Sequence, residues 1–211
     1  MANRIINAIS YCVKKVMYKI GGGGNKYLGI SLLRRFVNFK IAGTGNTIII
    51  KSKLPANVRV FIYGNNHRLF IDKGVTFKKG VIWFEDSGCE IHIGESTTIE
   101  DANLAVAETG TKLVIGKDCM LSSSVHIATT DSHSIIDTST GERTNPAKNI
   151  TIGNHVWLGY CANIGKGVSI GDNAVVAGHS VVTKSVSEGT IVAGVPAKVV
   201  NEGITWARAR L

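Results

Sequence analysis

The chain has 211 residues, of which 24 are Lys or Arg and 15 are Asp or Glu, so its formal net charge at pH 7 is +9. This length suits one domain and is enough to bury a hydrophobic core. A basic chain fits nucleic acid, an anionic membrane or acidic small molecules. No basic cluster alternates with aromatic residues, which argues against nucleic acid, and no apolar stretch reaches the roughly 18 residues of a membrane span.

The first 46 residues are expected to form a helical cap and a hinge. Apolar residues recur at helical spacing through residues 3–20, with basic residues elsewhere, which predicts an amphipathic helix. Such a helix either covers the open end of a repeat domain or rests on a membrane surface or a partner. We favour the cap, because the helix lacks the Trp and Phe that anchor at a bilayer. The run Gly21–Gly24 is then expected to be a hinge, and Lys26–Phe36 a second short helix.

The cysteines and histidines predict no metal site. The four cysteines, at positions 12, 89, 119 and 161, lack the close pairs of a metal site, and no His-x4-His pair occurs. This cysteine pattern indicates a reducing compartment. Lys14 and Lys15 interrupt the apolar run near the start, so residues 3–20 do not resemble a signal peptide. These observations together predict a cytoplasmic protein.

Two related repeats fill most of the remaining chain. From residue 47, apolar tetrapeptides recur every 22 residues, so Ile49, Ile71, Ile93 and Ile115 are expected to stack inside a solenoid, with Cys119 buried nearby. Six hexapeptides then run without a break from 152 to 187: IGNHVW, LGYCAN, IGKGVS, IGDNAV, VAGHSV and VTKSVS. A period of six fits no α-helix. Residues 47–200 therefore predict an all-β solenoid, followed by a C-terminal tail over 201–211.

One insertion interrupts the repeat. The coil over 115–132 is regular, except that a position expected to be small and neutral holds Asp131. The register then fails over residues 133–149 and resumes at Ile150. Loops on a rigid scaffold carry function, and departures from local regularity are expected at functional sites. The insertion, which opens with His133, is therefore the predicted place for chemistry.

Several motifs resemble one enzyme family. The hexapeptides, TTDSH at the insertion, ITIGNHVWLG and the tail AGVPAKVV are similar to the left-handed β-helix acyltransferases that use acetyl-CoA. The resemblance covers roughly residues 90–206. Within that family, CMLSSSVHIATTDSHSI, GER, GNHVWLG and ITWAR resemble sialate and polysialic-acid O-acetyltransferases of bacterial capsules. The resemblance implies a left-handed parallel β-helix and a homotrimer with sites between neighbouring subunits.

The resemblance also implies roles for individual residues. A neutral alcohol attacks a thioester slowly, so O-acetyl transfer needs a general base, and histidine has a suitable pKa. His133 occupies the position of the family's catalytic histidine. Trp157 is either a packing residue or, as in the resembling enzymes, a hydrogen-bond donor at the acetyl group. Asp131 either orients the imidazole or caps the turn. Arg143 is a candidate contact for an acidic acceptor, with an ordinary loop arginine as the alternative.

For acetyl-CoA, the resemblance implies a straight groove along the stacked coils. Compact lysine charges suit the phosphates of the nucleotide end. The residues assigned to the cofactor are Trp157, Tyr160, Gly178, Thr183, Lys184 and Lys198, with the phosphates near the two lysines.

We therefore expect an O-acetyltransferase in which an acceptor hydroxyl, deprotonated by His133, attacks acetyl-CoA directly. The expected acceptor is a sialic acid or a capsular polysaccharide. A neutral sugar or another small hydroxyl compound is the alternative acceptor. An alternative of a different class is a non-catalytic β-helix scaffold, which would need neither the insertion nor the AGVPAK motif.

Overall fold

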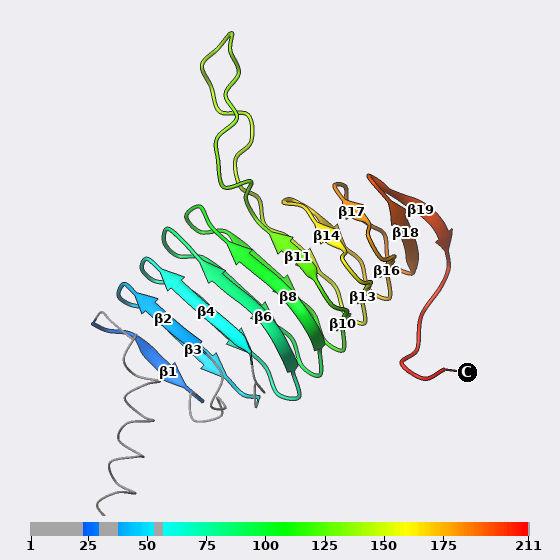
Figure 1. The fold of residues 1–211 in the computed structure, drawn as a ribbon, viewed down its shortest axis with the longest axis horizontal. Coiled ribbons are helices and arrows are strands. Elements are labelled where there is room, and N and C mark those ends of the chain that lie inside the picture. Colours follow the sequence, from blue (N-terminus) through cyan, green and yellow to red (C-terminus); the bar gives the residue numbers. More distant parts are fainter. Residues whose placement is uncertain (1–22, 30–37, 53–56, 211) are drawn as a thin grey trace, which may run out of the picture.

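The computed structural model describes residues 23–29, 38–52 and 57–210, and over these ranges every regular element is a strand. The helix expected over 3–20 lies outside the described residues. Across the described ranges, no helix is long and apolar enough to span a membrane. The strands stack as the coils of a parallel β-solenoid (Figure 1).

The first sheet has seven strands and receives one strand from each coil, in the order β1-β3-β5-β7-β9-β12-β15. Neighbouring strands in this sheet are parallel. Their bounds are β1 Lys26–Leu28, β3 Thr47–Ile50, β5 Arg68–Ile71, β7 Glu90–Ile93, β9 Lys112–Ile115, β12 Ile150–Ile152 and β15 Ser169–Ile170.

The second sheet has twelve strands and wraps around the remaining sides of the solenoid. The long β8 pairs with both β10 and β11, so a single strand of the early coils becomes two short strands in the later ones. The bounds are β2 Asn38–Ala42, β4 Val58–Tyr63, β6 Thr76–Phe84, β8 Thr98–Val106, β10 Met120–Leu121, β11 Val125–Ala128, β13 Trp157–Leu158, β14 Asn163–Ile164, β16 Val175–Val176, β17 Val181–Val182, β18 Thr190–Gly194 and β19 Ala197–Glu202.

Stacked aliphatic side chains fill the interior. Alternate residues of each strand point inward, and the inward side chains of successive coils meet because the strands are parallel and in register. One column contains Ile50, Ile71, Ile93, Ile115, Ile152 and Ile170, each no more than 2% exposed. The expected position of Cys119 in the core is confirmed, and burial raises the pKa of its thiol to about 11.

Two expectations about the early coils were wrong. The first full repeat is one residue shorter than the later ones, so Ile50 and not Ile49 stacks on Ile71. Residues 26–28 form β1, which pairs with β3, where a short helix was expected. β2 likewise pairs with β4, so the solenoid begins before residue 47. A short sequence that continues the alternation of an existing sheet edge gains hydrogen bonds there, and this tertiary context overrides local propensity.

The C-terminal boundary also differs from the expectation. β19 pairs antiparallel with β18 and ends at Glu202, so it crosses the expected boundary at residue 200. The chain beyond it returns along the solenoid, with the Ile204 N–H donating to the Gly189 carbonyl at 2.9 Å.

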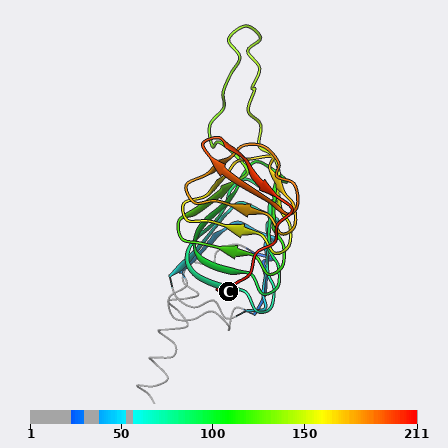
Figure 2. The ribbon, with the colours of Figure 1, turned by 90° about the vertical axis from the view of Figure 1, so that its right-hand side faces the viewer.

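The expected insertion is confirmed as a long excursion between β11 and β12. It projects well away from the coils, as both ribbon views show (Figures 1 and 2). Ile115 and Ile152 are partners in adjacent coils although 37 residues separate them, so the solenoid continues in register across the interruption.

Candidate active site

The base of the inserted loop is fixed by a polar network around Asn145. Its amide nitrogen donates to the Asp131 carboxylate at 2.8 Å and to the His133 carbonyl at 2.9 Å. Lys166, on the next coil, donates to the same carboxylate at 2.6 Å and to the Asn145 carbonyl at 2.7 Å. The hydrogen bond from Lys166 also lowers the pKa of Asp131. The carboxylate therefore holds the loop to the solenoid and does not contact the imidazole of His133.

A second contact ties the loop to the coil before it. The Arg143 guanidinium donates two hydrogen bonds to the Glu108 carboxylate, at 2.7 and 2.6 Å. Glu108 also accepts from the Thr130 hydroxyl at 2.8 Å and the Ala147 N–H at 3.2 Å. Because the guanidinium donors of Arg143 are used in these bonds to Glu108, the geometry gives no support to Arg143 as a contact for an acidic acceptor. Its observed contacts are structural.

The bond with Arg143 is the main reason that the pKa of Glu108 is lowered from 4.5 to about 2. A carboxyl with a depressed pKa stabilises the folded state fully above its ordinary value, and this contribution is lost as the pH falls through the folded-state value. We therefore expect Glu108→Gln to melt at a lower temperature than the wild-type protein at pH 7. The difference should shrink below pH 4.5 and vanish near pH 2, as followed by thermal unfolding.

The matched control for this prediction is Glu100→Gln. Glu100 pairs with Lys78 at 2.6 Å, but both side chains are about half exposed, and exposed ion pairs contribute little. The control should therefore melt close to the wild-type temperature at every pH. Equal losses in the two variants would contradict a special role for Glu108 in holding the loop.

His133 lies at the start of the loop with a fixed backbone and a free ring. Its N–H donates to the Asp131 carbonyl at 2.8 Å, and its own carbonyl accepts from Asn145. The residue is exposed, and within the described ranges its imidazole has no hydrogen bond, ion pair or ring contact. A histidine held at its backbone and unpartnered at its ring is available to exchange a proton with a bound molecule.

Trp157 opens β13 and is 37% exposed. Its ring lies 6.1 Å from that of Trp206, in the C-terminal segment that returns along the solenoid. Trp206 in turn stacks on the His155 imidazole at 4.1 Å and donates from its indole N–H to the His155 carbonyl at 2.7 Å. The tail thus packs beside Trp157. Sequence reasoning missed this contact, although the aromatic residue in a polar tail was a visible signal.

Arg208 completes the attachment of the tail. It donates to the Asp118 carboxylate at 2.9 Å and to the Cys119 carbonyl at 3.1 Å. Asp118 also contacts the His155 imidazole at 2.7 Å, so one carboxylate joins the tail to two adjacent coils. This cluster supports the edge of the solenoid at which Trp157 is exposed.

Within one chain, the structure does not bring His133 and Trp157 together. The loop leaves the solenoid at the corner between β11 and β12, whereas Trp157 begins β13 after the next corner. The strand β12 separates the two positions, and the two side chains make no contact with each other.

The residues assigned to acetyl-CoA fall at two corners of the solenoid. Tyr160 and Gly178 share one corner in successive coils, where the His179 N–H donates to the Tyr160 carbonyl at 2.7 Å. Lys198 lies in β19, opposite Ala193 of β18, and is near that corner. Thr183 and Lys184 instead follow β17 at the next corner. All five are exposed.

The fold and the inserted loop together define a class of protein. It is a parallel β-solenoid of hexapeptides with an inserted loop that presents an unpartnered histidine, which is the architecture of a hexapeptide-repeat transferase. Among the described residues, no group of three or more His, Cys, Asp or Glu side chains could hold a metal ion.

Comparisons with known proteins narrow this class. The bacterial transferase hexapeptide family, with six repeats, matches residues 149–184. The polysialic acid O-acetyltransferase of Neisseria meningitidis is 39% identical over 150 residues, which cover 69% of this chain and 68% of that protein. A protein of the same name from Escherichia coli O1:K1 / APEC is 36% identical over 57% of this chain and 39% of its own length.

Two solved structures share the fold over nearly the whole chain. The polysialic acid O-acetyltransferase OatWY has a TM-score of 0.82 and 35% identity, covering 90% of each chain. The polySia-specific acetyltransferase NeuO has a TM-score of 0.81 and 31% identity, covering 90% of this chain and 88% of its own. The chain therefore belongs to the hexapeptide-repeat acetyltransferases and is an enzyme, close to the polysialic acid O-acetyltransferases.

Proposed function

We propose that this enzyme transfers the acetyl group of acetyl-CoA to a hydroxyl of a sialic acid unit, in a capsular polysaccharide such as polysialic acid. The observation that carries the proposal is the likeness to two polysialic acid O-acetyltransferases over 90% of the chain. The free imidazole of His133, at the start of the loop that interrupts the repeat, supplies a group suited to the chemistry. The net charge of +9 also suits an acidic acceptor.

In the proposed reaction, the His133 imidazole takes the proton of the acceptor hydroxyl while the hydroxyl oxygen attacks the thioester carbonyl carbon. The carbon–oxygen bond forms and the carbonyl electrons move to an oxyanion, which the indole N–H of Trp157 stabilises. Collapse of this intermediate breaks the carbon–sulfur bond. The leaving thiolate then takes the proton from the imidazolium. The products are the O-acetyl ester and free CoA, and no acyl-enzyme forms.

We place the cofactor along the outer edge of the regular coils, beside Tyr160 and Gly178, with Lys198 near its phosphates. The exposed backbone at this corner offers partners for the amides of the pantetheine arm. Thr183 and Lys184 lie at the neighbouring corner, so they would contact a different part of the cofactor from the first pair.

We also propose that the enzyme is a homotrimer with its sites between subunits. Within one chain, β12 lies between His133 and Trp157. Both residues are exposed, so the His133 of one copy would face the Trp157 of a neighbouring copy in such a trimer. The cytoplasmic location stays a prediction from the cysteine pattern. Contact of residues 3–20 with a membrane surface is the alternative that we do not favour.

The proposal is tested by acceptor screening with the purified enzyme and acetyl-CoA. Thiol release and product mass are measured with polysialic acid, short sialic acid oligomers, free sialic acid and a neutral galactoside. We expect ester formation and stoichiometric thiol release with the sialic acid acceptors. Turnover with the neutral sugar alone, or no turnover with any acceptor, would contradict the proposed function.

A further inference from the structure

Three aromatic side chains cluster on the outside of the early coils, away from the aliphatic interior. Phe61 and Trp83 lie at partner positions in β4 and β6, with ring centroids 5.2 Å apart. Tyr63 lies 5.1 Å from Trp83 and is capped by the Lys40 ammonium, 5.1 Å from its ring. All three rings are partly exposed. The core is filled by aliphatic side chains, so the rings of this cluster form an apolar aromatic surface on the solvent side.

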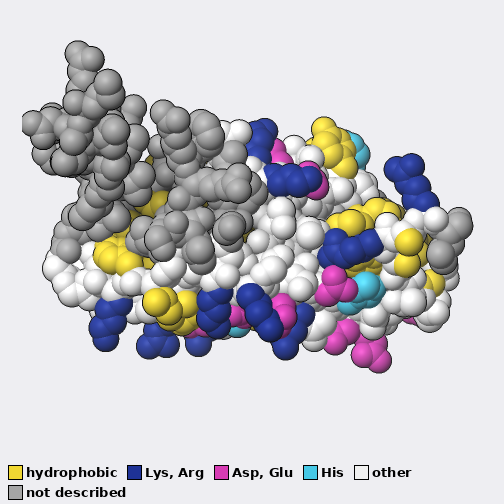
Figure 3. All heavy atoms as spheres, turned by 90° about the horizontal axis from the view of Figure 1, so that it is seen from below, with side chains coloured by type: hydrophobic (Ala, Val, Ile, Leu, Met, Phe, Trp, Pro, Cys, Tyr) yellow, Lys and Arg dark blue, Asp and Glu magenta, His cyan; other side chains and the backbone are white. Residues whose placement is uncertain are grey.

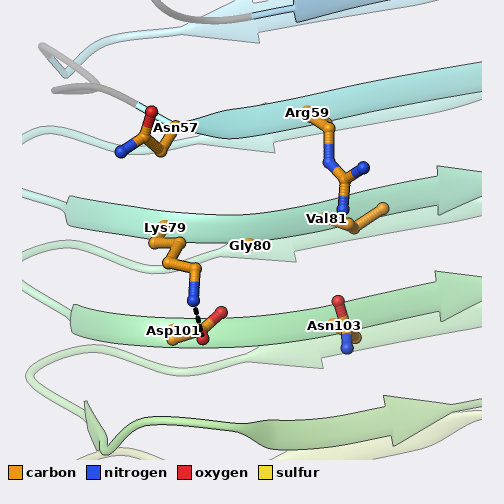
Figure 4. A pocket seen from close by; sticks show the side chains of 7 residues that line it. All are labelled: Asn57, Arg59, Lys79, Gly80, Val81, Asp101 and Asn103. Atoms are coloured by element: carbon orange, nitrogen blue, oxygen red, sulfur yellow. Dashed lines mark hydrogen bonds and ion pairs between the residues drawn. The ribbon is translucent and has the colours of Figure 1, made fainter.

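A shallow groove of about 400 Å³ lies beside this cluster, across β4, β6 and β8. Polar side chains from successive coils line it, namely Asn57, Arg59, Lys79, Asp101 and Asn103 (Figure 4). Lys79 donates to Asp101 at 3.0 Å, which neutralises both charges. The two amide side chains offer both donors and acceptors, so the groove is suited to a ligand with hydroxyl groups.

Arg59 differs in its charge pairing from four lysines on these coils. Lys51, Lys73, Lys78 and Lys79 each pair with a carboxylate on the next coil, at Asp72, Glu95, Glu100 and Asp101. A space-filling view shows basic side chains lying against acidic ones on one face of the solenoid (Figure 3). The register partners of Arg59 are instead Asn38 and Val81, and Asn103 follows one coil beyond Val81. In the described part of the chain its guanidinium has no ion pair or hydrogen bond.

The groove is continuous with the coil that carries the catalytic loop. The column that contains Arg59, Val81 and Asn103 continues to His126 in β11, and the column of Phe61 and Trp83 continues to Ala128. β11 ends at Ala128, just before the loop that presents His133. Successive coils are about 4.8 Å apart, so Trp83 lies about 10 Å from the last residue of β11 along the solenoid axis.

We propose that this surface, formed by Arg59, Asn103, Phe61, Tyr63 and Trp83, binds a segment of an acidic polysaccharide acceptor remote from the unit that is acetylated. The Arg59 guanidinium would pair with a sugar carboxylate, and the asparagine would bind hydroxyls. The aromatic faces would pack on the apolar faces of sugar rings. This inference rests on the proposed function, which supplies a polymeric acid as acceptor. It adds a second contact that favours long chains over short ones.

The test compares acceptor lengths in the full-length enzyme. The ratio of KM for short sialic acid oligomers to KM for long polysialic acid is measured for the wild-type protein, Arg59→Gln and Trp83→Ala. Binding at two linked sites strengthens the interaction only when one molecule spans both. We therefore expect each variant to raise KM for the long polymer about tenfold, with KM for short oligomers and kcat unchanged.

Lys78→Gln and Phe70→Ala are the matched controls. Lys78 is a paired cation beside the groove, and Phe70 is an aromatic residue on the other sheet, next to His92. Both variants should keep the wild-type ratio of KM for short oligomers to KM for long polysialic acid. Thermal melting confirms folding, and Arg59→Gln keeps the test valid if Trp83→Ala is unstable.

Three other results would each overturn a stated proposal. If the wild-type enzyme acetylates short oligomers but the two groove variants leave the ratio unchanged, the surface does not bind the polymer. If Trp83→Ala alters the oligomeric state in size-exclusion chromatography without altering the ratio, the surface contacts a second copy of the chain and the inference is overturned. A wild-type enzyme that acetylates no sialic acid acceptor would instead overturn the proposed function itself.

Discussion

Replacing His133 with alanine is expected to lower kcat for acetyl transfer by about 10²–10⁴. The loss follows from the chemistry, because without a base the acceptor hydroxyl must attack the thioester as a neutral alcohol. The thermal stability should change little, since the ring has no contact within the described ranges and the backbone bonds to Asp131 and Asn145 remain. The measurement is thiol release from acetyl-CoA at saturating acceptor, together with a melting curve.

His92→Ala is the matched control for this prediction. His92, on β7, is a partly exposed histidine that contacts Asp72 at 2.9 Å, and it lies one coil before the coil that carries the loop. Its replacement should leave kcat unchanged. A His133→Ala enzyme with the wild-type rate would eliminate the general-base mechanism, whereas a parallel loss in both variants would point to a defect in folding.

The period of the sequence predicted the solenoid because hydrophobic spacing reports directly on which side chains face inward. The stacking of Ile71, Ile93 and Ile115 followed from their constant spacing of 22 residues. The first column member was misplaced by one position, because one repeat is a residue shorter. A single missing residue leaves the apolar pattern almost unchanged, and only the hydrogen-bond register distinguishes Ile49 from Ile50.

The position of the inserted loop was predictable, but the contacts that hold it were not. The failure of the repeat after residue 132 located the loop. The partners that hold it come from other coils, with Arg143 bound to Glu108 and Lys166 bound to Asp131. These pairs are separated by 35 residues, and the tail contact between Trp206 and His155 by 51. No local pattern records such distances, since they depend on how the coils stack.

The polar network at the base of the loop restricts how the loop can move. Asn145 and Lys166 fix the start of the loop, and Arg143 fixes the segment that returns to the solenoid through its bond to Glu108. Because both sides of the loop base are attached, the exposed imidazole of His133 is presented at the edge of its own solenoid in a defined orientation. Such rigidity is needed if the second half of the site belongs to another copy of the chain, because catalysis depends on closely defined geometry.

Mixed trimers should recover activity that neither parent variant has. We expect His133→Ala and Trp157→Phe to be defective for different reasons. The first lacks the base, and the second keeps an aromatic ring but lacks the indole N–H, a loss typical of about 10²–10³ in kcat. The two variants are co-expressed with different affinity tags and purified through both. Each resulting trimer then contains both kinds of subunit.

If the loop of each subunit meets the tryptophan of its neighbour, a mixed ring of three contains a single site with both intact residues. Its activity should therefore be about a third of the wild-type value. Doubly tagged trimers of His133→Ala alone are the control and should stay inactive. If both residues acted within one chain, no mixture could restore an intact site, and the mixed trimers would stay at the level of the parents. The separation of His133 from Trp157 by β12 leads us to expect recovery.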